Sequence, residues 1–181
     1  MSGSSTAGPL AKGSDPGARI AGDRVEASVA VAIDPVAAFD LFTRATDLWW
    51  RRGVRFRAAG RAPSALHFEP RTGGRLFEEY EGDAGPCLVE FGRIIAWEPP
   101  VRLVFEWRNS NFTADEMTEV EVSFAPIPSG TRVTVVHRGW ASLPADHPVR
   151  HGMDTAAFIR TMGLWWGDLL SSLREHAARA R

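Results

Sequence analysis

The sequence predicts an α+β fold in which a curved antiparallel β-sheet wraps around one long C-terminal helix. Residues 101–108 alternate apolar and polar side chains, with Leu103, Phe105 and Trp107 on the apolar face, which is the period of a half-buried strand. Residues 156–178 instead repeat large apolar side chains at three- and four-residue spacing, which is typical of an amphipathic helix. An antiparallel sheet with all its helices on one side is an α+β layer fold.

The composition narrows the classes of function. The formal net charge of -1 over 181 residues argues against wholesale nucleic-acid binding, which usually leaves a strongly basic domain. No apolar run approaches the roughly 20 residues that span a bilayer. Cys87 is the only cysteine, so no internal disulfide can form and a cytoplasmic location is expected. The sequence has no P-loop, dinucleotide-binding or zinc-finger spacing, and we expect neither a cofactor nor a metal.

The first 22 residues have a different character from the rest of the chain. Residues 1–22 are rich in Ser, Gly and Ala and contain hardly any large apolar side chain. Such a segment cannot bury enough apolar surface to fold, so we expect a disordered tail. Residues 23–181 are long enough to form one domain with its own core.

The first elements of this domain follow from local signals. Residues 25–33 alternate and predict a strand. Asp34 and Pro35 then supply an N-cap and a first-turn proline, which predict a short amphipathic helix over residues 36–42. A second short helix follows, and residues 51–64, rich in arginine and glycine, predict a loop.

Most of the chain after this loop predicts strands, separated by turn residues. The paired Pro99 and Pro100 stop one strand before the next begins, because proline cannot donate to the ladder. The expected strands are residues 66–69, 75–81, 87–97, 101–108, 117–125 and 131–140. In the long helix that follows, the side chains expected to face the sheet are Phe158, Met162, Trp165, Leu169 and Leu173.

Six segments carry a resemblance to a known family: residues 35–42, 48–50, 72–75, 97–107, 130–137 and 163–170. With them the chain resembles the START-like (SRPBCC) superfamily, and within it the group similar to the C-terminal domain of the activator of the heat-shock protein 90 ATPase. The resemblance covers residues 25–178 and implies a helix-grip fold with a ligand cavity. It does not fix a reaction, because the superfamily includes lipid carriers, polyketide cyclases and stress-resistance proteins.

Large apolar side chains on inward faces place a candidate ligand site between the sheet and the long helix. Phe105 and Trp107 share the inward face of one strand. On another strand His137 follows Val133 and Val135 at two-residue spacing, so its side chain should point inward as theirs do. Trp166 is expected to close the site from the helix. His137 would orient the ligand through one hydrogen bond. Each residue has a structural alternative, which is core packing for the aromatic residues and a hydrogen-bonded strand-end position for His137.

Two charged groups also suggest chemistry. Glu78, Glu79, Glu81 and Glu90 could share a proton across neighbouring strands, but strand alternation favours an acidic surface in solvent. An anion-binding lip to the cavity could be formed by the loop arginines and the aromatic residues among and just before them, which are Arg51, Arg52, Arg55, Arg57, Arg61, Trp49, Trp50 and Phe56. Loop arginines are more often solvated or paired with carboxylates.

Histidine and cysteine give weaker signals. His147 and His151 have the four-residue spacing of a zinc pair on a helix, yet Pro148 between them argues against a regular helix. Cys87 begins a strand without an obvious histidine partner, so an inert thiol is expected.

These observations together predict a protein that binds a small hydrophobic or aromatic ligand. Nucleic acid and a membrane span are not expected, and a homodimer stays open. One alternative is an interaction module that assists a chaperone ATPase. Another is a cyclase- or hydrolase-like enzyme that uses His137 with a carboxylate. A closed and empty cavity would favour the interaction module, whereas an open cavity with buried ionisable groups would favour the enzyme.

Overall fold

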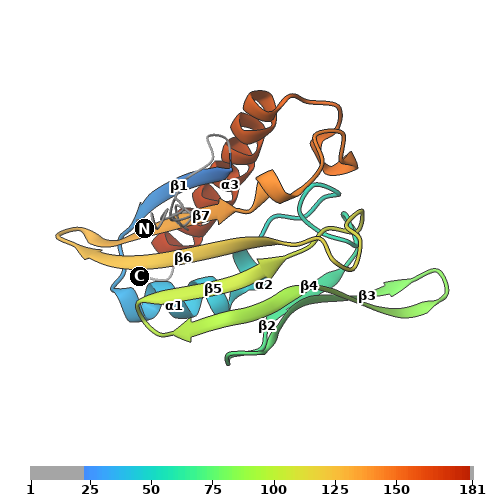
Figure 1. The fold of residues 1–181 in the computed structure, drawn as a ribbon. Helices are drawn as coiled ribbons and strands as arrows, with labels where there is room; N and C mark the ends of the chain where they lie inside the picture. Colours follow the sequence, from blue (N-terminus) through green and yellow to red (C-terminus); the bar gives the residue numbers. More distant parts are fainter. Residues whose placement is uncertain (1–22, 180–181) are drawn as a thin grey trace, which may run out of the picture.

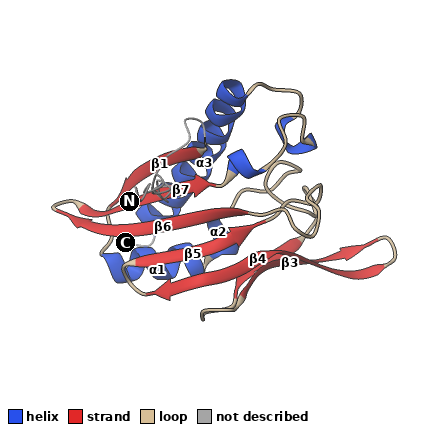
Figure 2. Cartoon of the chain, viewed as in Figure 1, coloured by secondary structure: helices blue, strands red, loops and turns tan. Residues whose placement is uncertain are grey.

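A computed structural model describes residues 23–179, so the tail predicted for residues 1–22 lies outside the described residues. The described chain forms seven strands, three α-helices and two short 3₁₀ helices (Figures 1 and 2). Their bounds, in chain order, are β1 Arg24–Val31, α1 Pro35–Thr43, α2 Thr46–Trp49, β2 Ser64–Phe68, β3 Arg75–Gly82, β4 Gly85–Glu98, β5 Arg102–Trp107, β6 Thr118–Ile127, β7 Gly130–Arg138, η1 Trp140–Ser142, η2 Pro148–Arg150 and α3 Thr155–Arg179.

All seven strands join one antiparallel sheet in the order β1-β7-β6-β5-β4-β3-β2. The first strand therefore pairs with the last, with Val25 opposite His137. The register shifts between Leu76 and Phe77 and again between Ile94 and Ala96, and such bulges increase the local bend and twist of a sheet. The helices lie on one face of the sheet (Figure 2), which confirms the predicted α+β fold class.

The short helix α1 begins where the sequence predicted. The Asp34 side chain accepts a hydrogen bond from the Ala37 N–H at 3.0 Å, and Pro35 occupies the first helical turn. The buried face of the helix packs Phe39 and Phe42 against Phe124 of β6. This aromatic cluster is part of the hydrophobic core between α1 and the sheet.

The long helix α3 has the predicted extent, but its buried stripe differs in one tryptophan. Trp166 is 4% exposed, whereas Trp165 is half-buried and packs against the core, so Trp166 is the more buried of the two. Successive residues of a helix lie about 100° apart, and Leu170 and Ala177 on the side of Trp166 are also buried. The buried arc is therefore centred nearer Trp166, and Trp165 lies at its edge.

The predicted inward face of β5 is buried, but Val104 on the opposite face is buried as well, at 2% exposed. Leu103 and Phe105 are fully buried, and Trp107 at the end of the strand is partly buried.

The strand β7 ends earlier than expected, because Gly139 adopts φ 96° and turns the chain out of the ladder. Trp140 consequently begins a 3₁₀ helix instead of continuing the strand.

Candidate ligand pocket

A recess of about 50 Å³ lies beneath α3, where the ends of β5 and β7 meet the loop between α2 and β2. Its walls come from five separate parts of the chain. The lining residues are Trp50, Arg55, Phe56, Trp107, Asn109, His137, Trp140, Val149, Met162, Trp165, Trp166 and Leu169. Five of these are tryptophans, so indole rings form most of the wall.

The exposure of the lining residues separates the bottom of the recess from its mouth. His137, Trp140 and Trp166 are each less than 5% exposed and form the bottom. Arg55 and Asn109 are exposed and mark the side where the recess meets solvent. The guanidinium carbon of Arg55 lies 5.5 Å from the ring centre of Trp165 and 5.9 Å from that of Phe56. These cation–π contacts place Arg55 over the mouth.

Stacked aromatic rings hold Trp107 in place. Its indole lies between Phe91, at 5.1 Å with an interplanar angle of 6°, and Trp50, at 5.9 Å with an angle of 20°. Trp50 in turn meets Trp166 edge to face at 5.8 Å. Two rings are therefore stacked on Trp107, which fixes the orientation of its indole in the wall of the recess.

A chain of hydrogen bonds crosses the bottom of the recess. Trp166 Nε1 donates to His137 Nδ1 at 3.2 Å, and His137 Nε2 lies 2.8 Å from the Thr118 hydroxyl. That hydroxyl donates to the Trp107 carbonyl at 3.1 Å. Because an indole N–H can only donate, Nδ1 of His137 must accept and its proton must lie on Nε2. Both ring nitrogens are thus used within the protein.

Burial controls the charge of His137. Desolvation lowers the pKa of His137 from 6.5 to about 3, because the charged ring would lose its hydration at the bottom of the recess. The rings around it, Trp107, Trp140 and Trp166, carry no charge that could offset this cost. His137 is therefore neutral at physiological pH.

The structure brings together three of the four residues singled out by sequence. Trp107, His137 and Trp166 all line the recess. Phe105 lies outside the lining, is fully buried, and packs edge to face on Phe68 at 5.2 Å. It lies two residues before Trp107 on the same face of β5, so it supports the wall from the core instead of contacting the recess.

Several lining residues were not identified from the sequence as members of this site. Trp50 and Phe56 were noted only as aromatic neighbours of the loop arginines, and Trp140 was expected to end a strand. The mixed arginine and aromatic composition of residues 51–64 was the available signal for the loop wall. Nothing local indicated Val149, because it reaches the recess from a 3₁₀ helix.

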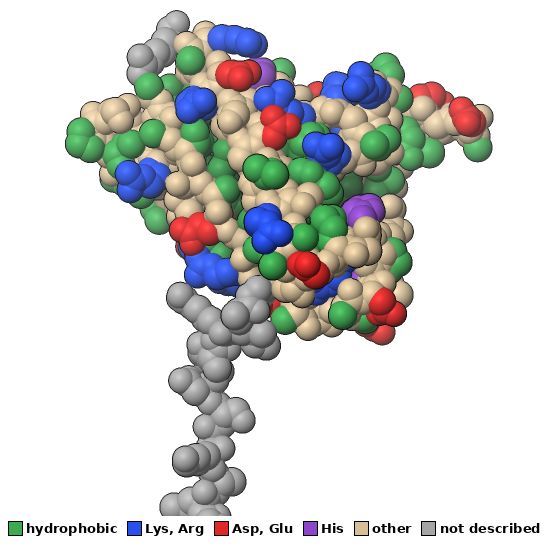
Figure 3. All heavy atoms as spheres, turned by 90° about the horizontal axis from the view of Figure 1, so that it is seen from above, with side chains coloured by type: hydrophobic (Ala, Val, Ile, Leu, Met, Phe, Trp, Pro, Cys, Tyr) green, Lys and Arg blue, Asp and Glu red, His purple; other side chains and the backbone are tan. Residues whose placement is uncertain are grey.

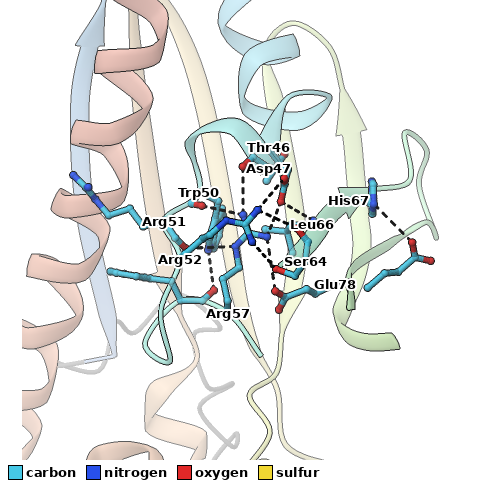
Figure 4. Close-up of polar contacts among 12 residues, drawn as sticks. Thr46, Asp47, Trp50, Arg51, Arg52, Arg57, Ser64, Leu66, His67 and Glu78 are labelled. Carbon is cyan, nitrogen blue, oxygen red and sulfur yellow. Dashed lines mark hydrogen bonds and ion pairs between the residues drawn. The ribbon is translucent and has the colours of Figure 1, made fainter. Parts of the chain in front are cut away.

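A buried ion-pair cluster anchors the loop that forms this wall (Figure 4). The Arg57 side chain is fully buried and donates from Nη1 to Asp47 Oδ1 at 2.8 Å and from Nη2 to the Trp50 carbonyl at 2.9 Å. Its Nη1 also lies 3.8 Å from Oε1 of the fully buried Glu78. Glu78 Oε2 accepts from the Ala58 N–H at 2.6 Å. Loop, helix α2 and strand β3 are therefore joined through one guanidinium.

The charges of this cluster correct one expectation. Burial alone would raise the pKa of Asp47, but hydrogen bonds from Arg57 and from the Leu66 N–H outweigh it and lower the pKa. Glu79, Glu81 and Glu90 are exposed as expected, whereas Glu78 is buried, so the assignment of Glu78 to a solvated face is wrong. The reason is that Arg57, distant in sequence, supplies its counter-charge.

The other candidate groups have ordinary structural roles. His147 hydrogen-bonds Glu116 at 3.1 Å and accepts from the Val149 N–H, while His151 is exposed and has a left-handed backbone. No group of three or more potential metal ligands gathers anywhere in residues 23–179. Charged side chains of both signs are interspersed on the face seen in Figure 3.

The curled seven-stranded sheet, the long C-terminal helix against it and the recess between them define a helix-grip domain. The chain belongs to the family described as "Activator of Hsp90 ATPase homolog 1-like protein", which matches residues 33–160 and is part of the START-like superfamily. The predicted resemblance is thereby confirmed. A search of curated proteins gives no match to the chain.

Solved structures share this fold at low sequence identity. A Staphylococcus aureus protein described as of unknown function has a TM-score of 0.62 and 12% identity, with 87% of this chain and 94% of that chain covered. A Nitrosomonas europaea protein has a TM-score of 0.60 and 15% identity, covering 90% and 99%. An AHSA1-like protein of Aeromonas hydrophila has a TM-score of 0.54 and 18% identity, covering 87% and 93%. Within residues 23–179, no helix is both long and apolar enough to cross a membrane.

Proposed function

We propose that this protein binds a small hydrophobic or aromatic molecule in the recess between the sheet and α3, in the cytoplasm. The observation that carries the proposal is the recess itself, whose walls are mainly indole and aliphatic side chains. Ligand sites of proteins are concave and mostly apolar, with a few polar groups that set orientation. No Asp or Glu side chain lines this recess among the described residues.

The size of the recess sets a condition on binding. Its volume of about 50 Å³ is well below the roughly 300 Å³ or more of a typical small-molecule site. A ligand larger than a few atoms must therefore displace side chains. At the mouth Arg55 is exposed and lies over the half-buried Trp165, so we propose that these two side chains move outward when a ligand enters.

The proposed roles of the site residues follow from their contacts. Trp107 offers indole surface to the ligand, and Trp166 closes the bottom of the site. His137 positions Trp166 through the hydrogen bond to Nδ1 and contributes its ring surface, since neither nitrogen is free to bind a ligand. Phe105 supports Trp107 from the core.

The enzyme alternative lacks an acid–base pair in this recess. A general base needs a free nitrogen or carboxylate within hydrogen-bond reach of the substrate. Both nitrogens of His137 are engaged, and the buried carboxylate of Glu78 interacts with Arg57 and the Ala58 N–H. A role for the chain beside a chaperone ATPase has no support beyond the description of its family.

Native mass spectrometry of the purified protein is the first test, because a co-purified small molecule would identify the ligand directly. Variants then locate its site. We expect Trp107→Ala to weaken binding of a naphthalene dye far more than His137→Ala does, since Trp107 contributes contact area. Trp97→Ala is the matched control, because Trp97 packs on Phe39 outside the recess. Unchanged binding in a folded Trp107→Ala variant would place the site elsewhere.

A further inference from the structure

The polar groups of the recess, taken one by one, indicate what a ligand must offer. The deep groups are already paired: Trp50 Nε1 donates to the Phe56 carbonyl, and Trp166 and His137 bind each other. Asn109 Oδ1 accepts from the Ser110 N–H, and its amide hydrogens remain available at the mouth. The deep side-chain acceptor of the described lining, His137 Nδ1, is therefore already engaged.

Donors, in contrast, remain without partners. The indole N–H of Trp140 is buried at the bottom of the recess and meets no acceptor, and a buried donor without an acceptor is costly. At the mouth, the Arg55 guanidinium makes cation–π contacts but no hydrogen bond or ion pair with any described residue. One unpaired donor is thus buried in a lining residue at the bottom of the recess, and a second, positively charged donor group lies at its opening.

Its position in the recess makes Arg55 distinctive among the loop arginines, because Arg61 is also exposed and without an ion pair to a described residue but lies outside the lining. Arg51 binds Asp168 at 2.9 Å, Arg52 lies 3.5 Å from Asp47, and Arg57 is enclosed in its buried cluster. Arg55 alone of these four lines the recess. Its position over Trp165 places a guanidinium beside the apolar opening.

We propose that the ligand is an aromatic carboxylate, whose ring enters the indole-lined recess and whose carboxylate meets Arg55 and the Asn109 amide at the mouth. This assignment rests on the proposed function and adds the charge of the ligand to it. A carboxylate has acceptor lone pairs and no donor, which matches a lining that has donors to spare. A guanidinium can bind it in a bidentate geometry.

Three probes with one ring system test the charge directly: 1-naphthaleneacetate, the neutral 1-naphthaleneacetamide and the cationic 1-naphthylethylamine. Binding is measured by isothermal titration calorimetry on the full chain. Because Arg55 is exposed to solvent, we expect the acetate to bind only about fivefold more tightly than the amide, the magnitude of an exposed ion pair. The amine is expected to bind more weakly than either.

Two variants assign the preference to Arg55. Arg55→Gln should remove the preference for the acetate and leave the affinity for the amide within about twofold, as expected for loss of an exposed ion pair. Arg61→Gln makes the same charge change in the same loop, outside the recess, and should keep the preference. Equal affinities for acetate and amide in the wild type, or a preference that survives Arg55→Gln, would overturn the charge assignment alone. Failure of all three probes to bind would overturn the proposed function with it.

Discussion

Replacement of His137 by glutamine tests whether this histidine is held neutral at the bottom of the recess. His137 is 1% exposed, and burial lowers its pKa from 6.5 to about 3. As the pH falls through 6.5 the unfolded chain takes up a proton at this ring, but the folded protein does so only near pH 3. Between these values the unfolded state binds more protons, so the free energy of unfolding falls as the pH is lowered.

The size of this effect follows from the window between the two pKa values. Below the unfolded pKa each further pH unit costs about 1.4 kcal/mol, so His137 alone removes about 2–3 kcal/mol of stability between about pH 7 and about pH 4.5. Glutamine cannot take up a proton. We therefore expect His137→Gln to be less stable than wild type at the higher pH but to lose less stability on acidification.

Urea denaturation of both proteins at both pH values measures this difference. Carboxylates with lowered pKa values, such as Glu69 and Asp47, also reduce stability in acid, but they are present in both proteins and cancel in the comparison. The free energy of unfolding should fall by about 2–3 kcal/mol more in wild type than in the variant. An equal loss in the two proteins would show that His137 is not a buried neutral group.

Three further predictions concern the core, the loop anchor and the family's namesake role. Leu169→Ala should lower the free energy of unfolding by about 2–5 kcal/mol in denaturant titrations, because Leu169 is 4% exposed. The control Leu164→Ala, at a residue that is 73% exposed, should change it by no more than about 0.5 kcal/mol. Equal losses of stability in the two variants would contradict the packing of α3. Arg57→Met should cost about 3–5 kcal/mol by leaving Asp47 and Glu78 without their partner, whereas Arg61→Met should leave the melting temperature unchanged. The proposed role is the binding of a small molecule, so this chain alone should not stimulate a chaperone ATPase. A several-fold rise in ATPase rate at stoichiometric protein would refute that expectation.

The features predicted correctly from the sequence are those set by local periodicity. Leu103, Phe105 and Trp107 share one face of β5 because the register of this strand with β6 is unbroken. The extent of α3 followed from one continuous apolar stripe. That stripe is wide, and the spacing of its residues could not show which of Trp165 and Trp166 would be more deeply buried. The answer depends on where the sheet lies against α3, and the sequence of the helix does not give that position.

The polar interior could not be predicted because its partners are distant in sequence. Glu78 is buried because Arg57 reaches it from the loop before β2, and His137 is paired because Thr118 and Trp166 come from β6 and α3. Strand parity predicted that His137 points inward. It could not show that both nitrogens would be occupied there.

The indole N–H resonances of the tryptophans test the central claim most directly, because ¹⁵N-labelled protein reports each ring separately during a titration with 1-naphthaleneacetate. The chain has seven tryptophans, and Trp97 lies outside the recess, against Phe39. Binding in the recess predicts saturable shifts of the indole signals of Trp107, Trp140, Trp165 and Trp166, with Trp97 unmoved. Saturable shifts confined to Trp97, or no shift at any indole, would contradict a ligand site between the sheet and α3.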